Sequence, residues 1–237
     1  MGIRQPLLRQ GISRMKILNV SITVRNLTKA VHFYRDNLLL PIEVTSTSAV
    51  VTIGSSRLRL SAGDSFEGVH HLAFGILPSE FDFAHEWLAR RVSLLQADGS
   101  DVILGSKEWQ SRSLYFLGPE GIILEFIARE ADASILISKG ENPHMLSISE
   151  VGIGVEDVLA TVATLSEELA IPNYYDYSSM FASMGSHDGL LIVVQQERLW
   201  FPNKVSQPAS GPLSVQIEAP AGKSRVDLNS RISIVRA

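Results

Sequence analysis

The chain has 237 residues, of which 45% are hydrophobic and 19% charged, a balance that suits a packed globular protein rather than a disordered one. Its 25 acidic and 21 basic residues give a formal net charge of −4, and no block rich in lysine and arginine reverses this locally, so we expect no nucleic-acid partner. The absence of cysteine excludes disulfides, thiolate metal sites and cysteine nucleophiles.

The first residues are set apart from the rest of the sequence. Arg4, Arg9 and Arg14 precede Met15, and no apolar region of a secretory signal is present. We therefore interpret residues 1–15 as a leader or tag-like segment and leave it out of the fold argument. The apolar runs elsewhere are far too short to cross a bilayer, so we expect no membrane partner and a cytoplasmic location.

A strand-like run followed at once by an amphipathic helix recurs along the chain. The opening runs have the length and composition of strands, and they span residues 19–24, 71–76 and 150–155. The helical periodicity that follows spans residues 27–38, 79–91 and 158–169. Asn26 is placed to cap the first helix, and Ser79 with Asp82 predicts a capping-box-like start for the second.

Short strand-like runs separated by turn residues follow each helix, so the repeating unit is predicted to be βαβββ. A fourth opening run at 213–218 has no helix behind it, which indicates a truncated fourth unit. Such units predict an α+β fold of curved mixed sheets with helices outside. The predicted segments are paired units one and two at 16–128, a linker at 129–144, and the third unit with the truncated fourth at 145–237.

Three segments resemble the vicinal-oxygen-chelate superfamily, which includes glyoxalase I, extradiol dioxygenases, and fosfomycin- and bleomycin-resistance proteins. They are the strand-to-helix segment at 24–39, the run at 69–74 containing two histidines, and the strand–turn–strand segment at 115–126 that contains Glu125. The resemblance implies that two units pair and form a cup for a divalent metal. It also implies that the metal ligands come from the first and last strands of the units.

By this resemblance His71 and Glu125 are metal ligands, and the ion is Fe, Mn, Ni or Zn. The position at which the family carries a second histidine is occupied by Asn19, the third candidate ligand. The remaining last-strand position falls near Arg59, which cannot bind a cation. In the third unit Glu150 could be a ligand, but the residue that corresponds to Glu125 is Val193, which cannot bind a metal.

Glu125 interrupts an apolar strand, and a buried carboxylate needs a cation or hydrogen bonds. Either a metal or an ion pair with Arg59 or Arg112 meets that need. Arg59, Arg112 and Tyr115 are the candidates for the substrate pocket, and Glu125 is the candidate catalytic residue.

Two functions are open at this point. The first is a metal-dependent enzyme that acts on a small molecule with vicinal oxygens, as a glyoxalase-like lyase or isomerase or as a ring-cleaving dioxygenase. The second is a metal-free small-molecule-binding protein, comparable to the bleomycin-resistance members. Units one and two are expected to form one cup, and unit three to pair with unit four or with another chain. An open sheet edge in the fourth unit favours a homodimer.

Overall fold

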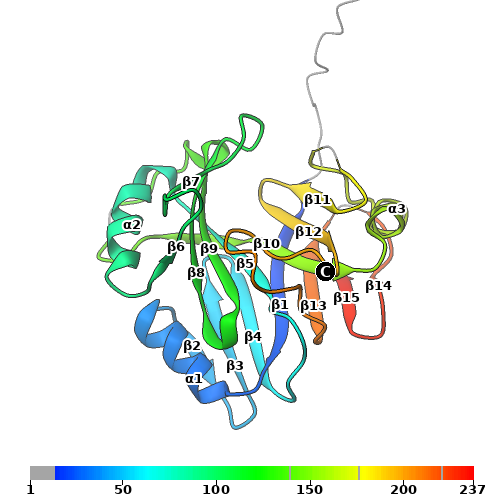
Figure 1. The fold of residues 1–237 in the computed structure, drawn as a ribbon, viewed down its shortest axis with the longest axis horizontal. Helices are drawn as coiled ribbons and strands as arrows, with labels where there is room; N and C mark the ends of the chain where they lie inside the picture. The colour runs from blue at the N-terminus through cyan, green and yellow to red at the C-terminus, as the bar shows by residue number, and fades with distance from the viewer. Residues whose placement is uncertain (1–13, 139, 176, 220) are drawn as a thin grey trace, which may run out of the picture.

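The computed structural model describes residues 14–138, 140–175, 177–219 and 221–237. The predicted leader lies outside the described residues except for Arg14 and Met15. Two mixed β-sheets form the centre of the molecule, and the helices lie on the outside (Figure 1). This arrangement confirms the predicted α+β fold built from βαβββ units.

The first sheet, called sheet A, has the strand order β14-β15-β13-β1-β4-β3-β2. Its strands are β1 (Lys16–Val24), β2 (Ile42–Val44), β3 (Ser48–Ile53), β4 (Ser56–Ala62), β13 (Leu213–Glu218), β14 (Arg225–Asp227) and β15 (Ile232–Arg236).

The second sheet, called sheet C, has the order β11-β12-β10-β5-β9-β8-β6, and β7 pairs with β8. Its strands are β5 (His71–Ile76), β6 (Leu94–Leu95), β7 (Ile103–Leu104), β8 (Ser111–Leu117), β9 (Ile123–Arg129), β10 (Met145–Val155), β11 (Phe181–Ser186) and β12 (Gly189–Gln195).

The helices α1 (Leu27–His32), α2 (Phe81–Ala89) and α3 (Val158–Leu169) follow the opening strands of the first three units, and five π-helical residues extend α1. The predicted cap at Asn26 is confirmed, because its side chain accepts a hydrogen bond from the Lys29 backbone N–H. The capping box predicted for α2 is wrong. Pro78 opens a short 3₁₀ turn there, which moves the start of the α-helix to Phe81.

The pairing of the units differs from the prediction. Units one and two do not share a sheet: β5 pairs antiparallel with β10, and β1 pairs antiparallel with β13. Unit two therefore joins unit three in sheet C, and unit one joins the fourth unit in sheet A.

The burial of the strands explains this choice of partners. All six residues of β5 are buried, as are the last eight of β10, whereas β1 and β13 alternate between buried and partly exposed residues. A sheet that is covered on both faces needs strands that are apolar on both faces, and a half-exposed sheet needs alternation. Units two and three have opening strands that are apolar on both faces, as sheet C requires. Units one and four have alternating opening strands, as sheet A requires.

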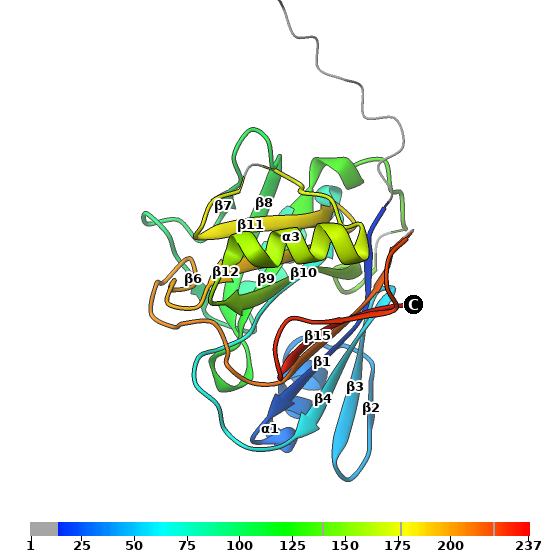
Figure 2. The ribbon, with the colours of Figure 1, turned by 90° about the vertical axis from the view of Figure 1, so that its right-hand side faces the viewer.

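The main hydrophobic core lies between the sheets and their helices, with Phe74, Phe116, Phe126 and Trp87 among its largest side chains. Figure 2 shows α3 lying across β11 and β12, which it contacts. A smaller apolar cluster on the other face of sheet C consists of Ile123, Leu190, Ile192, Val194 and Trp200. Within the described ranges, no helix combines the length and the apolar character needed to span a lipid bilayer.

Homodimerisation stays a prediction. The strands at the sheet edges are β14 and β2 in sheet A and β11 and β6 in sheet C. The longest of them is β11, with six residues, and an edge strand exposes backbone groups that pair readily with a second chain. We expect light scattering at micromolar concentration to give twice the mass of one chain. The mass of a single chain at every concentration would contradict this prediction.

Candidate metal centre and cavity

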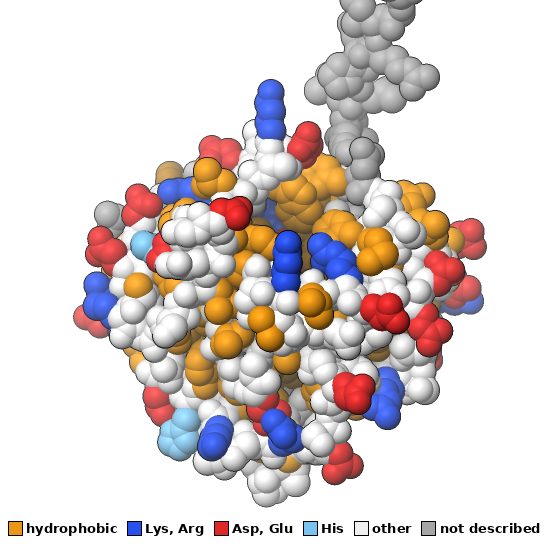
Figure 3. Space-filling model, viewed as in Figure 1, with side chains coloured by type: hydrophobic (Ala, Val, Ile, Leu, Met, Phe, Trp, Pro, Cys, Tyr) orange, Lys and Arg blue, Asp and Glu red, His pale blue; other side chains and the backbone are white. Residues whose placement is uncertain are grey.

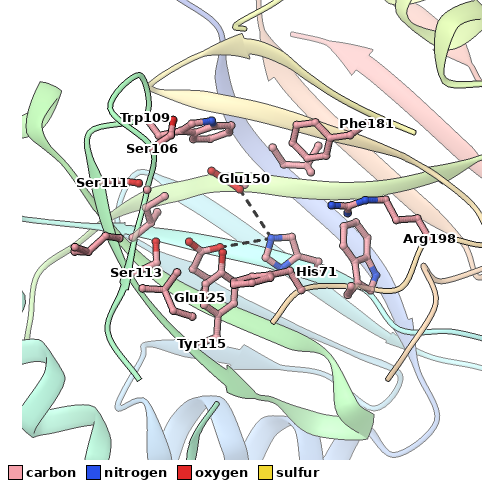
Figure 4. A pocket seen from close by; sticks show the side chains of 17 residues that line it. His71, Ser106, Trp109, Ser111, Ser113, Tyr115, Glu125, Glu150, Phe181 and Arg198 are labelled. Carbon is pink, nitrogen blue, oxygen red and sulfur yellow. Dashed lines mark ion pairs between the residues drawn. The ribbon is translucent and has the colours of Figure 1, made fainter. Parts of the chain in front are cut away.

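Three neighbouring strands of sheet C bring together one histidine and two glutamates. His71 begins β5, Glu125 lies in β9 and Glu150 lies in β10. Ala73 of β5 is in register with Glu125 on one side and with Glu150 on the other. Because side chains alternate along a strand, His71 shares the face of Ala73, and the three functional groups point toward one another (Figure 4).

The spacing of these groups suits a shared cation. The Nε2 atom of His71 lies 3.6 Å from Oε2 of Glu125 and 3.9 Å from Oε2 of Glu150. The three residues each offer one ligand atom, and these atoms lie within 4.8 Å of one another. Nδ1 of His71 lies 3.3 Å from the carbonyl oxygen of Ile123. That contact suits a ring that donates from Nδ1 and keeps the Nε2 lone pair toward the carboxylates.

Glu125 is a buried carboxylate with a free oxygen. Its side chain is almost inaccessible, and Oε2 has no hydrogen-bond partner among the described residues. Burial, together with the negative charge of Glu150, raises the pKa of Glu125 to about 7. A buried carboxylate oxygen without a partner that faces a histidine nitrogen fits the donor set of a cation site.

Glu150 differs from Glu125 because it forms an ion pair with an arginine side chain. Arg129, the last residue of β9, is buried and donates to Oε1 of Glu150, and it also donates to the hydroxyl of Ser149 over 3.1 Å. Burial alone would raise the pKa of Glu150, but the charge of Arg129 and the nearby His71 outweigh it and lower the pKa. Oε2 of Glu150 stays directed toward His71.

The two carboxylates also act on the histidine. Burial alone would lower the pKa of His71, whereas contact with Glu150 and the negative charges of both glutamates raise it, and the net direction is upward. With His71 neutral, the charges of Glu125, Glu150 and Arg129 leave one net negative charge in a buried place. A divalent cation or a proton on His71 can balance that charge.

A cavity of about 370 Å³ opens onto these three residues. Its polar part also includes Ser113 and Tyr115, and its walls are largely aromatic, with Trp109, Phe181, Trp200 and Phe201. Figure 3 shows hydrophobic side chains gathered in a hollow of the surface, with lysine or arginine side chains at its edge. Such a cavity suits a small ligand with a flat or apolar body.

Trp200 comes from the loop behind β12 and packs against the histidine. Its ring centroid lies 5.2 Å from that of His71, and its Nε1 donates to the carbonyl of Val69 over 3.0 Å. A Cβ at Gly152 would lie 2.5 Å from the Trp200 ring and 3.0 Å from Cβ of His71. The glycine in β10 therefore makes room for the aromatic ring of Trp200 beside His71.

The structure separates the other predicted site residues. Tyr115 lines the cavity, and its ring is stacked 6.2 Å from that of His71. Asn19 and Arg59 lie in β1 and β4 of sheet A, outside the cavity. The expectation that they lie beside His71 and Glu125 is therefore wrong. The cause is the pairing of β5 with β10 instead of β1. Arg112 is likewise outside the cavity, because it pairs with Asp82 at 3.2 Å.

The structure adds two details of the third unit. Glu150, a possible ligand from the sequence, lies in the first strand of unit three as His71 does in unit two, and it is buried beside His71. Ile192, not Val193, faces the cavity, since Ile192 is in register with Gly152. The position in β12 beside His71, Glu125 and Glu150 is therefore apolar.

Replacing Arg129 by alanine should lower the free energy of unfolding by about 3–5 kcal/mol, because Glu150 would keep a buried charge without its cation. Arg59→Ala is the matched control: Arg59 is exposed and forms no ion pair with a described residue, so its loss should change stability by no more than about 0.5 kcal/mol. Urea unfolding measures both. Equal losses in the two variants would contradict the role given to the buried pair.

Comparison with known proteins gives a partial sequence match. No family model matches the chain. The metallothiol transferase FosB of Staphylococcus haemolyticus is 28% identical over 137 residues, which cover 54% of this chain and 94% of the relative. FosB of Staphylococcus saprophyticus is also 28% identical over 137 residues, covering 54% of this chain and 87% of the relative.

Two solved structures share the fold over most of the chain. A proposed dioxygenase of Bacillus subtilis has a TM-score of 0.60 and 13% identity, and the match covers 94% of this chain and 85% of that one. Glyoxalase I of Zea mays has a TM-score of 0.55 and 13% identity, covering 87% and 75%. The repeated βαβββ units, the predicted motifs and these likenesses agree: the chain shares the glyoxalase/dioxygenase fold and resembles the vicinal-oxygen-chelate superfamily.

Proposed function

We propose that this protein is a metal-dependent enzyme whose divalent ion is held by His71, Glu125 and Glu150. The observation that carries the proposal is the convergence of one imidazole and two carboxylates at the wall of a ligand-sized cavity. The name of the FosB relatives, metallothiol transferase, agrees with a metal. We propose Fe, Mn, Ni or Zn as the ion, since a nitrogen and two carboxylate oxygens suit all four.

The donor set fits such an ion for three reasons. Oε2 of Glu125 is buried and lacks a partner within the described part of the chain. Oε2 of Glu150 is left for the ion because Arg129 holds Oε1. The orientation of His71 is fixed by the carbonyl of Ile123. A ligand whose orientation is set by a second protein group binds metal more strongly.

The bound ion would supply Lewis acidity toward vicinal oxygens of a small substrate. The residues of the chain would bind and orient that substrate. Aromatic side chains of the cavity would cover its apolar body and exclude water, and burial keeps Tyr115 protonated because it raises the pKa of the phenol well above its usual range. Glu125 is the candidate catalytic residue, since its carboxylate lines the cavity and could accept a proton from a substrate bound there.

Within this class, a glyoxalase-like isomerisation or lyase reaction and an extradiol-type ring cleavage both use vicinal oxygens. The aromatic walls favour a flat substrate and therefore give some support to ring cleavage. We propose the cytoplasm as the location and a small molecule as the physiological ligand.

A second candidate function is metal-free binding of a small molecule. It is favoured by the ion pair between Arg129 and Glu150, which already neutralises one carboxylate, and by the raised pKa of His71, which favours a proton there in place of the ion. In that case the same cavity would bind its ligand without catalysis.

Elemental analysis of the purified protein before and after dialysis separates the two functions. We expect about one divalent ion per chain, and we expect Glu125→Gln to release it, because a neutral amide lacks the charge that helps hold the ion. Glu130→Gln is the control, since Glu130 follows the same strand but is exposed. Protein that takes up no Fe, Mn, Ni or Zn even after incubation with each would decide for metal-free binding.

A further inference from the structure

Arg198 is a cation held at the wall of the cavity. It lines the cavity together with His71, Glu125 and Glu150, and its guanidinium group points inward (Figure 4). Among the described residues that line this cavity, it is the only lysine or arginine. The loop that carries it is tied at both ends. The Arg198 backbone N–H donates to Gln195 over 2.9 Å, and Trp200 is anchored on Val69.

The guanidinium group of Arg198 is supported but not neutralised. It lies over the ring of Phe181, 5.3 Å from the centroid, which orients it by a cation–π contact. In the described ranges no carboxylate forms an ion pair with Arg198, and no residue accepts a hydrogen bond from its guanidinium group. Arg129, by contrast, has Glu150 as its partner. Partial burial also lowers the pKa of Arg198. A partly buried arginine with five donors and no acceptor is poorly placed unless a ligand supplies the acceptor.

We propose that Arg198 binds an anionic group of the substrate, so that the substrate is a small, flat anion with vicinal oxygens at one end and a carboxylate or similar group at the other. This inference rests on the proposed function, because the metal centre is the partner of the vicinal oxygens. The planar fork of arginine matches a carboxylate in a bidentate manner. The aromatic side chains that line the same cavity suit a ring. Arg198 is thus a specificity-determining residue.

The test compares two probes, catechol and 3,4-dihydroxybenzoate, which share the vicinal hydroxyls and differ in a carboxylate on the far side of the ring. Calorimetric titration of the zinc-loaded protein should give at least tenfold tighter binding of the carboxylate-bearing probe. Arg198→Gln should weaken that probe by about ten- to a hundredfold and leave catechol unchanged, since only one probe uses the guanidinium. Arg198→Lys should retain part of the preference.

Control variants and metal removal separate the two proposals. Arg59→Gln, an exposed arginine of sheet A, should alter neither affinity. Removing zinc with a chelator should weaken both probes alike if the metal holds the vicinal oxygens. Unchanged catechol binding after metal removal would count against the proposed function, and the Arg198→Gln comparison would still decide the role of Arg198. The inference is overturned if the wild-type protein shows no preference for the carboxylate, or if Arg198→Gln weakens both probes equally.

Discussion

The antiparallel pairing of β5 with β10 is the interaction on which the site depends. It places Ala73 in register with Glu150, while the parallel pairing of β5 with β9 places the same residue in register with Glu125. Two carboxylates from neighbouring units, in β9 and β10, therefore flank one strand, and His71 lies on that strand. Burying two carboxylates together is unfavourable unless positive charge accompanies them. Arg129 provides part of that charge, and the cavity beside His71 has room for more.

The strand pairing also determines the polarity of the cavity. The same face of sheet C that carries the polar triad carries Ile123 and Ile192, and Trp200 from the following loop packs against it, so the acidic groups lie in apolar surroundings. Low polarity around the triad is what raises the pKa of Glu125 and of Tyr115. It would also strengthen the interaction of these groups with any charged ligand. Aromatic rings and charged side chains therefore line one and the same cavity.

Much of the local structure could be predicted from the sequence. Helical periodicity and the cap at Asn26 locate α1, and the motifs around His71 and Glu125 identify two residues that meet in the structure. The partners of the strands could not be read as directly, because each opening strand resembles the others. One difference in sequence distinguishes the opening strands of the two sheets. Ser21 and Thr23 alternate with apolar residues in β1, whereas Gly152 and Gly154 occupy the corresponding positions in β10.

The remaining site residues were missed for related reasons. The resemblance places Asn19 in the site, at the family's second histidine position, but β1 pairs with β13 and not with β5. Val193 was considered instead of Ile192, and an error of one residue in a strand moves a side chain to the opposite face. Arg129 gave no local signal, since its role depends on Glu150 from the neighbouring strand.

The pairing of the outer units has a consequence for how the molecule forms. Lys16 in β1 is in register with Glu218 in β13, about two hundred residues later along the chain. Sheet A therefore cannot close around β1 until almost all of the described chain is available. Until then β1 can pair only with β4 of its own unit, and its other edge has no partner. Such long-range contacts slow folding, because the entropy of a large loop is lost before the contact forms. A fragment that ends after β9 would leave both β1 and β5 with a free edge, so the two halves of the sequence are not two halves of the fold.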